Sequence, residues 1–287
     1  MIIFRESGRL GNQIFQYLAL RTICRKNEKL ILLGFKDLQE VFSGINADII
    51  NASSTKYDQS IYTKIYKSID YLSKINIFSR ISESMDSSEK PKIISNSALF
   101  PAIQLASTSY FQHQTSFNIE ATGSLDVAVK YLDFAKGILE ISGSATPIFV
   151  HIRRGDYLRW PDSKNPAVLP ANYYRKCIRI IQSNVPRPFF FFTSDDPYYV
   201  EDVFGKLKNS FISKFSSYED FAIMTQCHGG ILSASSFSWW AAYFSRLRYP
   251  GSIFLAPEYW GGHRTGSWFP PFIESTFLRY VTACESC

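Results

Sequence analysis

The chain lacks two features that would place it in a specialised class of protein. No stretch approaches the roughly 20 apolar residues of a membrane-spanning helix, although 46% of its 287 residues are hydrophobic. Charge is sparse as well, because only 20% of the residues are charged and the net charge is +6. That excess is too small for a dedicated nucleic-acid-binding protein and fits a small anionic ligand or an anionic membrane surface better. The composition also excludes disordered, collagen-like and coiled-coil proteins.

Cysteine is scarce, with five residues that are odd in number and scattered, which argues against a disulfide framework and for reduced thiols. Cys284 and Cys287 form a Cys-x-x-Cys pair, but no second Cys or His pair accompanies them, so we expect idle thiols rather than a metal or redox site. The first charged residue is Arg5, so the start of the sequence has no long apolar segment. We therefore expect neither a secretory signal nor a membrane anchor there. We therefore expect a soluble, cytoplasmic protein.

Length and pattern predict two α/β domains, since one domain usually takes roughly 150 residues. Residues 1–33 read as strand, glycine turn, helix and strand, which is the beginning of a parallel sheet. From Pro147 onward strands and helices alternate, which predicts a doubly wound α/β domain. The expected strands are 148–152, 189–193, 211–215, 230–233 and a last one at 253–256, and the expected helices are 171–183, 197–207, 218–227 and 237–247. We therefore expect two Rossmann-like domains, 1–144 and 145–287.

Residues 51–98 differ in composition and are rich in Ser, Lys, Tyr and Ile. Apolar residues at 61, 65, 69 and 72, with lysines at 64, 67 and 74, predict an amphipathic helix with a basic face near 58–80. An ordinary surface helix is the simpler interpretation, and peripheral docking on an anionic membrane is the alternative. Residues 82–92 have the polar composition of an exposed loop.

Polar clusters follow the predicted strands, which is where open parallel sheets bind ligands. They are residues 7–13, 151–156, 194–196 and 233–240. In the first, Gly8 and Gly11 at the start of a helix allow backbone N–H groups to approach a ligand. It is not a P-loop, because no Lys-Ser/Thr pair follows. A plain turn before a helix explains this cluster equally well.

Arg153 and Arg154 at a strand end need anionic partners, because unpaired guanidiniums there would be costly. A pyrophosphate suits them, since the guanidinium fork matches phosphate oxygens. Internal salt bridges to Asp156 or Asp195 are the alternative. Several serines near 235 offer hydroxyl and N–H groups to the same anion, more than helix capping requires.

These residues carry a resemblance to a known family. His151-Ile-Arg-Arg-Gly-Asp156 resembles the His-x-Arg-Arg-x-Asp motif of the fucosyltransferase superfamily. Residues 8–17 and 235–243 resemble the flanking motifs of glycosyltransferase family 11, the α-1,2-fucosyltransferases. Phe191–Asp196 and the Glu219-Asp220 pair also fit the motif pattern of this family. The resemblance runs from Gly8 to about Trp260, with no landmarks between about 35 and 100.

The resemblance implies a GT-B fold whose two Rossmann-like domains face a central cleft, with the acceptor on the first domain and the nucleotide sugar on the second. It implies transfer of L-fucose from GDP-β-L-fucose to a galactoside 2-hydroxyl, with inversion, during surface-glycan synthesis. No cofactor and no metal are expected. The two acids Asp195 and Asp196 are adjacent rather than alternating, so no two-ligand metal clamp is indicated. Arginines can neutralise the departing diphosphate instead.

The resemblance also implies roles for individual residues. The catalytic set is Arg153, Arg154 and Asp156. The donor-binding set is His151, Gly11, Asn12, Gln13, Ser194, Asp195, Asp220, Ser235, Ser236 and Ser238. Asp220 is similar in position to the acid that reads the guanine N1–H and N2–H₂ groups in related fucosyltransferases. Trp239 and Trp240 are expected to pack the helix rather than stack on a sugar.

Three matters stay open at this point. The base that takes the acceptor proton is Asp156, Glu6 or His113. The family's His-His-Ile-Ile-Ala-Asn-Ser segment has Gly229 and Ala234 in place of the second His and the Asn, so the donor is open between fucose and another nucleotide-linked deoxysugar. A non-catalytic nucleotide-sugar or glycan-binding protein and a nucleic-acid-binding protein are the other functional classes considered.

Overall fold

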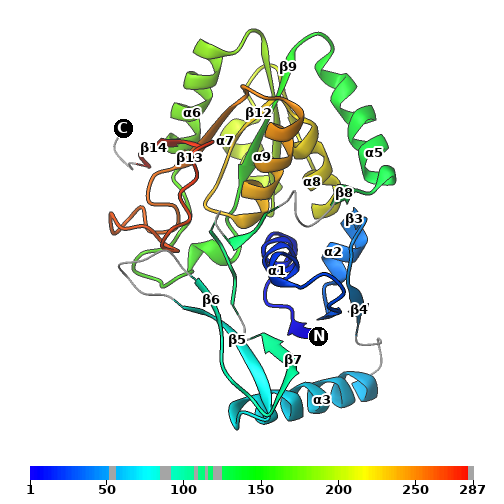
Figure 1. Cartoon of the computed structure of the whole chain (residues 1–287). Helices are drawn as coiled ribbons and strands as arrows, with labels where there is room; N and C mark the ends of the chain where they lie inside the picture. Colours follow the sequence, from blue (N-terminus) through cyan, green and yellow to red (C-terminus); the bar gives the residue numbers. More distant parts are fainter. Residues whose placement is uncertain (52–55, 85–91, 107–108, 114–115, 119–124, 284–287) are drawn as a thin grey trace. The chain divides into compact units, whose positions relative to one another are not determined.

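A computed structural model describes the chain except for residues 52–55, 85–91, 107–108, 114–115, 119–124 and 284–287 (Figure 1). It divides into two compact units, Met1–Ala128 and Val129–Cys287. The division precedes the expected 144/145 position because helix α5 (Val129–Leu139), which the sequence analysis did not predict, packs within the second unit. Its Phe134 ring lies 5.0 Å from that of Phe215. The Cys284 and Cys287 pair lies outside the described residues.

The first unit is built on a six-stranded sheet of order β4-β2-β1-β7-β5-β6. Its strands are parallel except for β6, which runs antiparallel to β5. The predicted strand–helix–strand beginning is confirmed. The elements are β1 (Ile2–Arg5), α1 (Leu10–Ile23), β2 (Leu30–Leu33), α2 (Lys36–Val41), β3 (Phe42–Ser43), β4 (Asp48–Ile50), α3 (Lys56–Lys74), β5 (Phe78–Ser84), β6 (Lys92–Ser95), β7 (Phe100–Ala106) and β8 (Asp126–Val127).

The predicted loop at 82–92 is wrong at both ends, because β5 continues to Ser84 and β6 begins at Lys92. Glu83 pairs with Ile93 across this antiparallel ladder. The polar residues 82–84 and Lys92 belong to these strands, because a strand with one face in solvent carries polar side chains. Residues 85–91 lie outside the described part. The predicted amphipathic helix is α3, which packs on β5 and β7 (Figure 1).

The second unit is a six-stranded parallel sheet of order β11-β10-β9-β12-β13-β14, and a helix connects each pair of consecutive strands from β9 to β13. This confirms the predicted doubly wound pattern. The elements after α5 are β9 (Thr146–Ile152), α6 (Ala171–Asn184), β10 (Pro188–Ser194), α7 (Pro197–Phe204), β11 (Ser210–Ile212), α8 (Ser217–Gln226), β12 (Gly229–Ile231), α9 (Ser236–Arg248), β13 (Ile253–Pro257) and β14 (Arg279–Val281).

The end of the chain differs from the prediction. A further strand, β14, which the sequence pattern does not predict, follows β13, and no helix occurs among the described residues 249–283. Gly261, Gly262 and Gly266 and the Pro270-Pro271 pair fall in this stretch, and these residue types interrupt helices. Within the described part of the chain, no helix is both long and apolar enough to cross a membrane.

The core of the second unit lies on the central strands β9 and β10. Ile148, Val150 and Phe192 are fully buried, because helices cover both faces of the sheet. The parallel register aligns Ile152 of β9 with Ser194 of β10. The chain segments that leave β9, β10 and β12 therefore start at one edge of the sheet, and the predicted polar clusters lie there.

Candidate functional site

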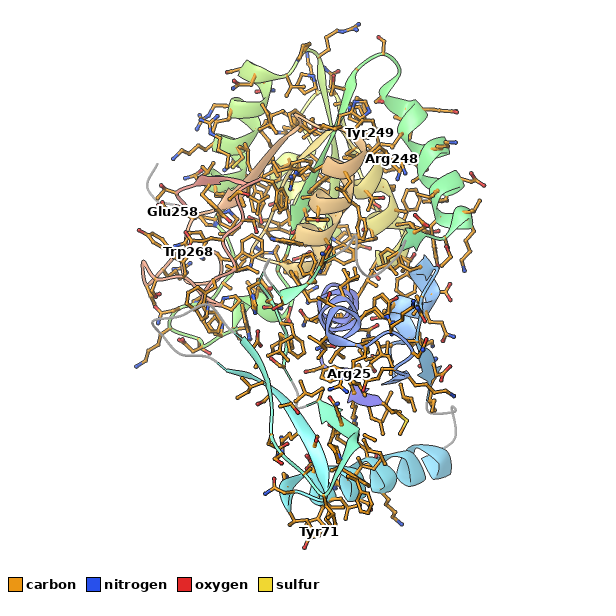
Figure 2. All side chains as sticks on the ribbon, viewed as in Figure 1. Arg25, Tyr71, Arg248, Tyr249, Glu258 and Trp268 are labelled. Atoms are coloured by element: carbon orange, nitrogen blue, oxygen red, sulfur yellow. The ribbon has the colours of Figure 1, made fainter. Side chains whose placement is uncertain are left out.

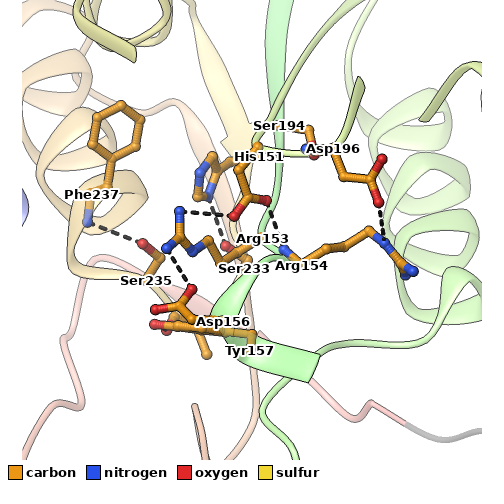
Figure 3. A network of polar contacts seen from close by, with 12 residues as sticks. His151, Arg153, Arg154, Asp156, Tyr157, Ser194, Asp196, Ser233, Ser235 and Phe237 are labelled. Carbon is orange, nitrogen blue, oxygen red and sulfur yellow. Dashed lines mark hydrogen bonds and ion pairs between the residues drawn. The ribbon is translucent and has the colours of Figure 1, made fainter. Parts of the chain in front are cut away.

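Three of the predicted polar clusters form one network at the carboxyl edge of the second sheet (Figure 3). Arg153 and Arg154 follow β9, Ser194 to Asp196 follow β10, and Ser233 to Ser235 follow β12 and open α9. Each strand supplies a different part of the network because parallel strands end at the same edge.

Arg153 is the central cation of this network. Its Nη2 atom lies 2.5 Å from Asp156 Oδ1, and its Nη1 atom lies 2.9 Å from Asp195 Oδ2. The guanidinium also lies 5.5 Å from the centre of the Tyr157 ring. The Arg153 side chain is only 15% exposed, so two carboxylates and a ring hold it in one orientation. The internal ion pairs considered from the sequence are therefore present.

Arg154 points in a different direction from Arg153 (Figure 3). Its Nε atom pairs with Asp196 Oδ2 at 3.0 Å, and its guanidinium stacks 3.5 Å from the centre of the Tyr199 ring. Asp196 is the N-cap of α7, where its side chain accepts a hydrogen bond from the Tyr199 N–H. Arg154 therefore binds the start of α7, and the two arginines do not form a joint clamp.

Asp195 connects the two strand ends. One of its oxygens accepts the backbone N–H of Arg154 at 2.9 Å, and the other pairs with Arg153. Gly155 makes room for this carboxylate, since a Cβ atom at that position would lie 2.5 Å from Asp195 Oδ2. The sequence alone indicates no role for Gly155, because this close approach comes from the segment after a neighbouring strand.

Gly155→Ala is expected to displace the Asp195 carboxylate and, with it, Arg153. We expect a loss of about 1–3 kcal/mol in unfolding free energy, as is usual for overpacking, and a fall in activity of roughly tenfold from the misplaced guanidinium. Thermal unfolding and steady-state kinetics measure both. The control is Gly137→Ala in α5, where a Cβ meets no atom within 4 Å and the helix gains about 0.5–1 kcal/mol. Equal behaviour of the two variants would contradict the role of Gly155.

His151 is buried beside Arg153, with its Nδ1 atom 2.7 Å from the Ser233 hydroxyl oxygen. Burial, followed by the charge of Arg153, lowers the pKa of His151 to about 3. The imidazole is therefore neutral at physiological pH. It can exchange hydrogen bonds with a ligand, but it adds no positive charge to the network.

The serines after β12 divide into two groups. Ser235 caps α9 by accepting the N–H of Phe237 at 3.3 Å, and Ser236 is half-buried at the first turn of the helix. Ser238 is fully buried, and its hydroxyl donates to the Ser233 carbonyl oxygen at 3.2 Å. Ser238 therefore stabilises the loop, while Ser235 and Ser236 lie at the sheet edge.

Aromatic side chains pack around the carboxyl edge of the second sheet. Trp239 and Trp240 are fully buried, so the expectation that they pack the helix is confirmed. Tyr157, to which the sequence analysis gave no role, donates its hydroxyl to the Ala234 carbonyl oxygen at 2.8 Å and stacks on Trp160. Tyr157 therefore ties the segment after β9 to the segment after β12.

Asp220 is a buried carboxylate on α8, 6% exposed, and the Ser213 hydroxyl donates to it. Burial raises the pKa of Asp220 to about 7, although the Ser213 hydrogen bond opposes that rise. The hydrogen bond to Ser213 links it to the segment after β11, a different strand from those that carry Arg153 and Ser235. A titratable group kept in this environment is typical of binding sites as well as of structural networks.

The predicted residues of the first unit lie at the start of α1. Gly8 has φ +87°, and the Asn12 side chain folds over it so closely that a Cβ atom at position 8 would clash with Asn12 Nδ2. Asn12 Oδ1 also accepts a hydrogen bond from Gln112 at 2.6 Å. Gly11 is buried in the first turn of the helix.

Gln13 and Glu6 form one hydrogen-bonded unit. Gln13 is 2% exposed, donates to Glu6 Oε2 at 2.6 Å and accepts the N–H of Leu38 at 2.9 Å. Glu6 also accepts the N–H of Phe35, which has positive φ. Burial raises the pKa of Glu6, although the hydrogen bond from Phe35 opposes that rise. Both side chains thus stabilise the turns that follow β1 and β2.

The three base candidates differ in exposure. His113 is 5% exposed and lies 2.8 Å from Glu83, whose side chain is 4% exposed. Burial raises the pKa of Glu83, but hydrogen bonds from His113 and Ser109 outweigh it and hold that pKa below its ordinary value. Glu6 is half-buried, whereas the Asp156 side chain is 57% exposed. Asp156 is therefore the most solvent-accessible of the three base candidates.

The sequence matches the model of one known protein family. Residues 107–264 match the model of the family described as Glycosyl transferase family 11, which is more than half of the chain. The chain belongs to glycosyl transferase family 11. The resemblance seen in the sequence motifs is therefore confirmed.

Relatives and solved structures agree with membership of family 11. The chain is 26% identical over 276 residues to an alpha-1,2-colitosyltransferase of Escherichia coli, covering 91% of this chain and 92% of the relative. It is 23% identical over 256 residues to galactoside alpha-(1,2)-fucosyltransferase 2 of Rattus norvegicus, covering 85% and 67%. A glycosyl transferase family 9 structure from Veillonella parvula matches with a TM-score of 0.51 at 14% identity, covering 89% and 80%. That likeness concerns the fold, which is of the GT-B type as expected.

The two departures of this family 11 member lie at opposite ends of β12. Gly229 has φ +154° at the amino end of the strand, where a Cβ would lie 2.8 Å from the Ile253 carbonyl oxygen. Ala234 lies beyond the carboxyl end, and its carbonyl accepts the Tyr157 hydroxyl. Gly229 therefore allows β12 to pack closely against β13. Ala234 is the departure from the family sequence that lies in the candidate site. Among the described residues, no group of three or more His, Cys, Asp or Glu side chains is placed to hold a metal ion.

Proposed function

We propose that this family 11 glycosyltransferase transfers L-fucose, with inversion, from GDP-β-L-fucose to the 2-hydroxyl of a galactoside during surface-glycan synthesis. The observation that carries the proposal is Arg153, a mostly buried guanidinium at the carboxyl edge of the parallel sheet next to the first turn of α9. A cation and the first turn of a helix at one edge of the sheet suit a diphosphate. The names of the two relatives support a deoxyhexose and an α-1,2 linkage.

Diphosphate binding requires a change at Arg153, because two carboxylates already neutralise its single positive charge. Asp195 is held in place by the Arg154 N–H and is 23% exposed, whereas Asp156 is 57% exposed. Asp156 is therefore the carboxylate that leaves, and a phosphate oxygen takes its place. Donor binding frees the Asp156 carboxylate beside the reacting sugar.

The freed Asp156 carboxylate is suited to act as the base that takes the proton of the acceptor hydroxyl. The acceptor oxygen forms a bond to the anomeric carbon as the bond from that carbon to the diphosphate oxygen breaks, and the hydroxyl proton passes to Asp156. Arg153 and the N–H groups at the start of α9 stabilise the negative charge that develops on GDP. His151 supplies a neutral hydrogen-bonding group, and Asp220 accepts the two donors of the guanine edge. Glu6 and His113 remain the alternatives for the base.

Other predicted residues support this arrangement in different ways. Ser194, Ser235 and Ser236 offer hydroxyl groups at the sheet edge, and Arg154 holds the segment after β9 against α7. Gly11, Asn12 and Gln13 lie in the first turn of α1 in the first unit, and we assign the acceptor to this unit. No metal ion enters the proposed chemistry.

A second donor is favoured by one observation, the E. coli relative named as a colitosyltransferase. Together with the change to Ala234 at the site edge, it makes another GDP-linked deoxysugar the candidate to compare with GDP-fucose.

The test is to incubate the full-length protein with GDP-fucose or GDP-colitose and a panel of galactosides, with EDTA in place of divalent metal. Mass spectrometry detects the product and NMR assigns its linkage. We expect an α-1,2-linked deoxyhexose product at a rate unaffected by EDTA. GDP binding by calorimetry without turnover across both donors and the whole panel would favour a non-catalytic binding protein. Salt-dependent binding to generic DNA would favour the nucleic-acid interpretation.

A further inference from the structure

Helix α3 of the first unit presents two different faces. Tyr66 and Ile69 pack against the buried cluster that contains Ile3, Leu33 and Leu105. The opposite side forms an exposed stripe, since residues three and four apart share one face of a helix. The members of this stripe are Lys64, Lys67, Ser68, Tyr71, Lys74 and Ile75.

The stripe carries positive charge without a carboxylate of its own. Three of its six members are lysines. Asp70 lies at its flank, where it pairs with Lys74 at 2.7 Å and lies 3.7 Å from Arg80. Among the described side chains of α3, one carboxylate therefore faces two cations, and Lys64 and Lys67 add further positive charge.

Large apolar side chains continue the stripe at the end of the helix. Tyr71 is 62% exposed and projects from the outer side of α3 (Figure 2), and Ile75 is 48% exposed. Leu99 and Phe100 are 72% and 55% exposed. The Leu99 N–H binds the Asn76 carbonyl oxygen at 3.0 Å, which places these two residues beside the helix end. A cluster of large apolar side chains in solvent marks an interaction surface.

We propose that this surface docks on an anionic lipid bilayer. We call it the α3 tip and define it as Lys64, Lys67, Tyr71, Lys74, Ile75, Leu99 and Phe100. The lysines bind the headgroup phosphates, and the four apolar side chains enter the boundary between headgroups and acyl chains, where tyrosine is especially favoured. Charge complementarity selects a lipid surface over a second copy of this chain, because two identical basic stripes repel each other. This proposal is independent of the donor and acceptor assigned above.

The test is co-sedimentation of the full-length protein with vesicles, without donor or acceptor. We expect at least tenfold stronger partitioning onto phosphatidylcholine vesicles that contain 30% phosphatidylglycerol, roughly one charge per three lipids, than onto pure phosphatidylcholine. The difference should shrink in 0.5 M salt, because surface electrostatics are screened over about 3–5 Å at that ionic strength.

Variants separate the two parts of the α3 tip. Leu99→Ser with Phe100→Ser removes apolar insertion, and Lys64→Glu with Lys67→Glu reverses charge. Each pair is expected to lower anionic vesicle binding at least tenfold. The matched controls lie in the second unit: Val129→Ser, at a side chain 70% exposed, and Lys206→Glu with Lys208→Glu, both exposed. The controls should bind vesicles as the unchanged protein does, and thermal unfolding checks that every variant is folded.

Two outcomes would overturn the proposal. One is vesicle binding that is absent, or equal on neutral and anionic lipid. The other is a dimer, seen by light scattering, that Leu99→Ser converts to a monomer, since that result assigns the surface to a second copy of the chain.

Discussion

Arg153→Ala is expected to lower the kcat/KM of sugar transfer roughly 100- to 1,000-fold, which is the usual cost of removing one preorganised donor to a developing oxyanion. Arg153 is the network's central cation, and Asp156 and Asp195 hold it in position before the donor arrives. GDP affinity, measured by calorimetry, should fall as well. Arg153→Lys keeps the charge but loses the two-nitrogen fork, so we expect an intermediate loss.

Arg154→Ala is the matched comparison, because the neighbouring arginine points toward α7. It removes the ion pair with Asp196 and the stacking on Tyr199. These contacts are partly exposed, so we expect a loss of about 1 kcal/mol in unfolding free energy and a much smaller kinetic effect than at position 153. Steady-state kinetics and thermal unfolding of both variants provide the measurement. If the two alanine variants lose activity equally, both guanidiniums act on the donor and the divergence in the structure is irrelevant to catalysis.

Asp220→Asn is expected to stabilise the free protein at pH 8 and to weaken its binding of GDP. The pKa of Asp220 rises from 3.8 to about 7 on folding because the carboxyl group is buried. Between these values the folded state binds more protons than the unfolded state, so stability falls as pH rises. The contribution is fully present below pH 3.8 and is lost above about pH 7, on the order of 4 kcal/mol in total. The amide has no such dependence and still accepts the Ser213 hydroxyl.

The same variant tests the guanine assignment. An ionised carboxylate accepts two adjacent donors of the base, whereas an amide offers one acceptor and places N–H groups against the other donor. Loss of such a bidentate contact costs about 1–3 kcal/mol, so GDP affinity should fall roughly 10- to 100-fold at pH 8. For the unchanged protein, GDP affinity should fall as pH decreases below about 7, because protonation removes the carboxylate.

Glu219→Gln provides the control on the same helix. Glu219 is half-buried and completes the capping box with Ser216 at the start of α8, so its replacement should leave GDP affinity unchanged. Denaturant titrations from pH 4 to pH 8 and calorimetry with GDP measure both effects. Unchanged GDP affinity in Asp220→Asn would assign Asp220 a purely structural role.

The second unit could be predicted largely from its sequence. Strands buried on both faces are continuous apolar runs, so β9 and β10 stand out, and the polar residues that end each run mark the edge where ligands bind. Helix α5 was missed because its place in the second unit depends on ring contacts with residues such as Phe215, far along the chain. Strand β14 was missed because three residues give too little periodicity to recognise.

The features of the candidate site that could not be predicted from the sequence depend on the direction in which each side chain points. Arg153 and Arg154 are adjacent residues of the same type, and the sequence does not reveal that the first pairs with Asp156 and Asp195 whereas the second pairs with Asp196 at the start of α7. The same holds for Gln13, whose polar side chain suggested a ligand contact but lies inside the first unit on Glu6. A sequence locates polar residues on elements, whereas their partners depend on tertiary packing.

Both six-stranded sheets end in short strands, which affects how the protein behaves at high concentration. The outermost strands β4, β11 and β14 have three residues each and β6 has four, although the central strands β9 and β10 have seven. An unpaired edge is a template for strand addition by another molecule, and short edge strands limit that pairing. The long, phenylalanine-rich strands that could drive amyloid-like stacking are thus kept in the middle of the sheet, with pairing partners on both sides.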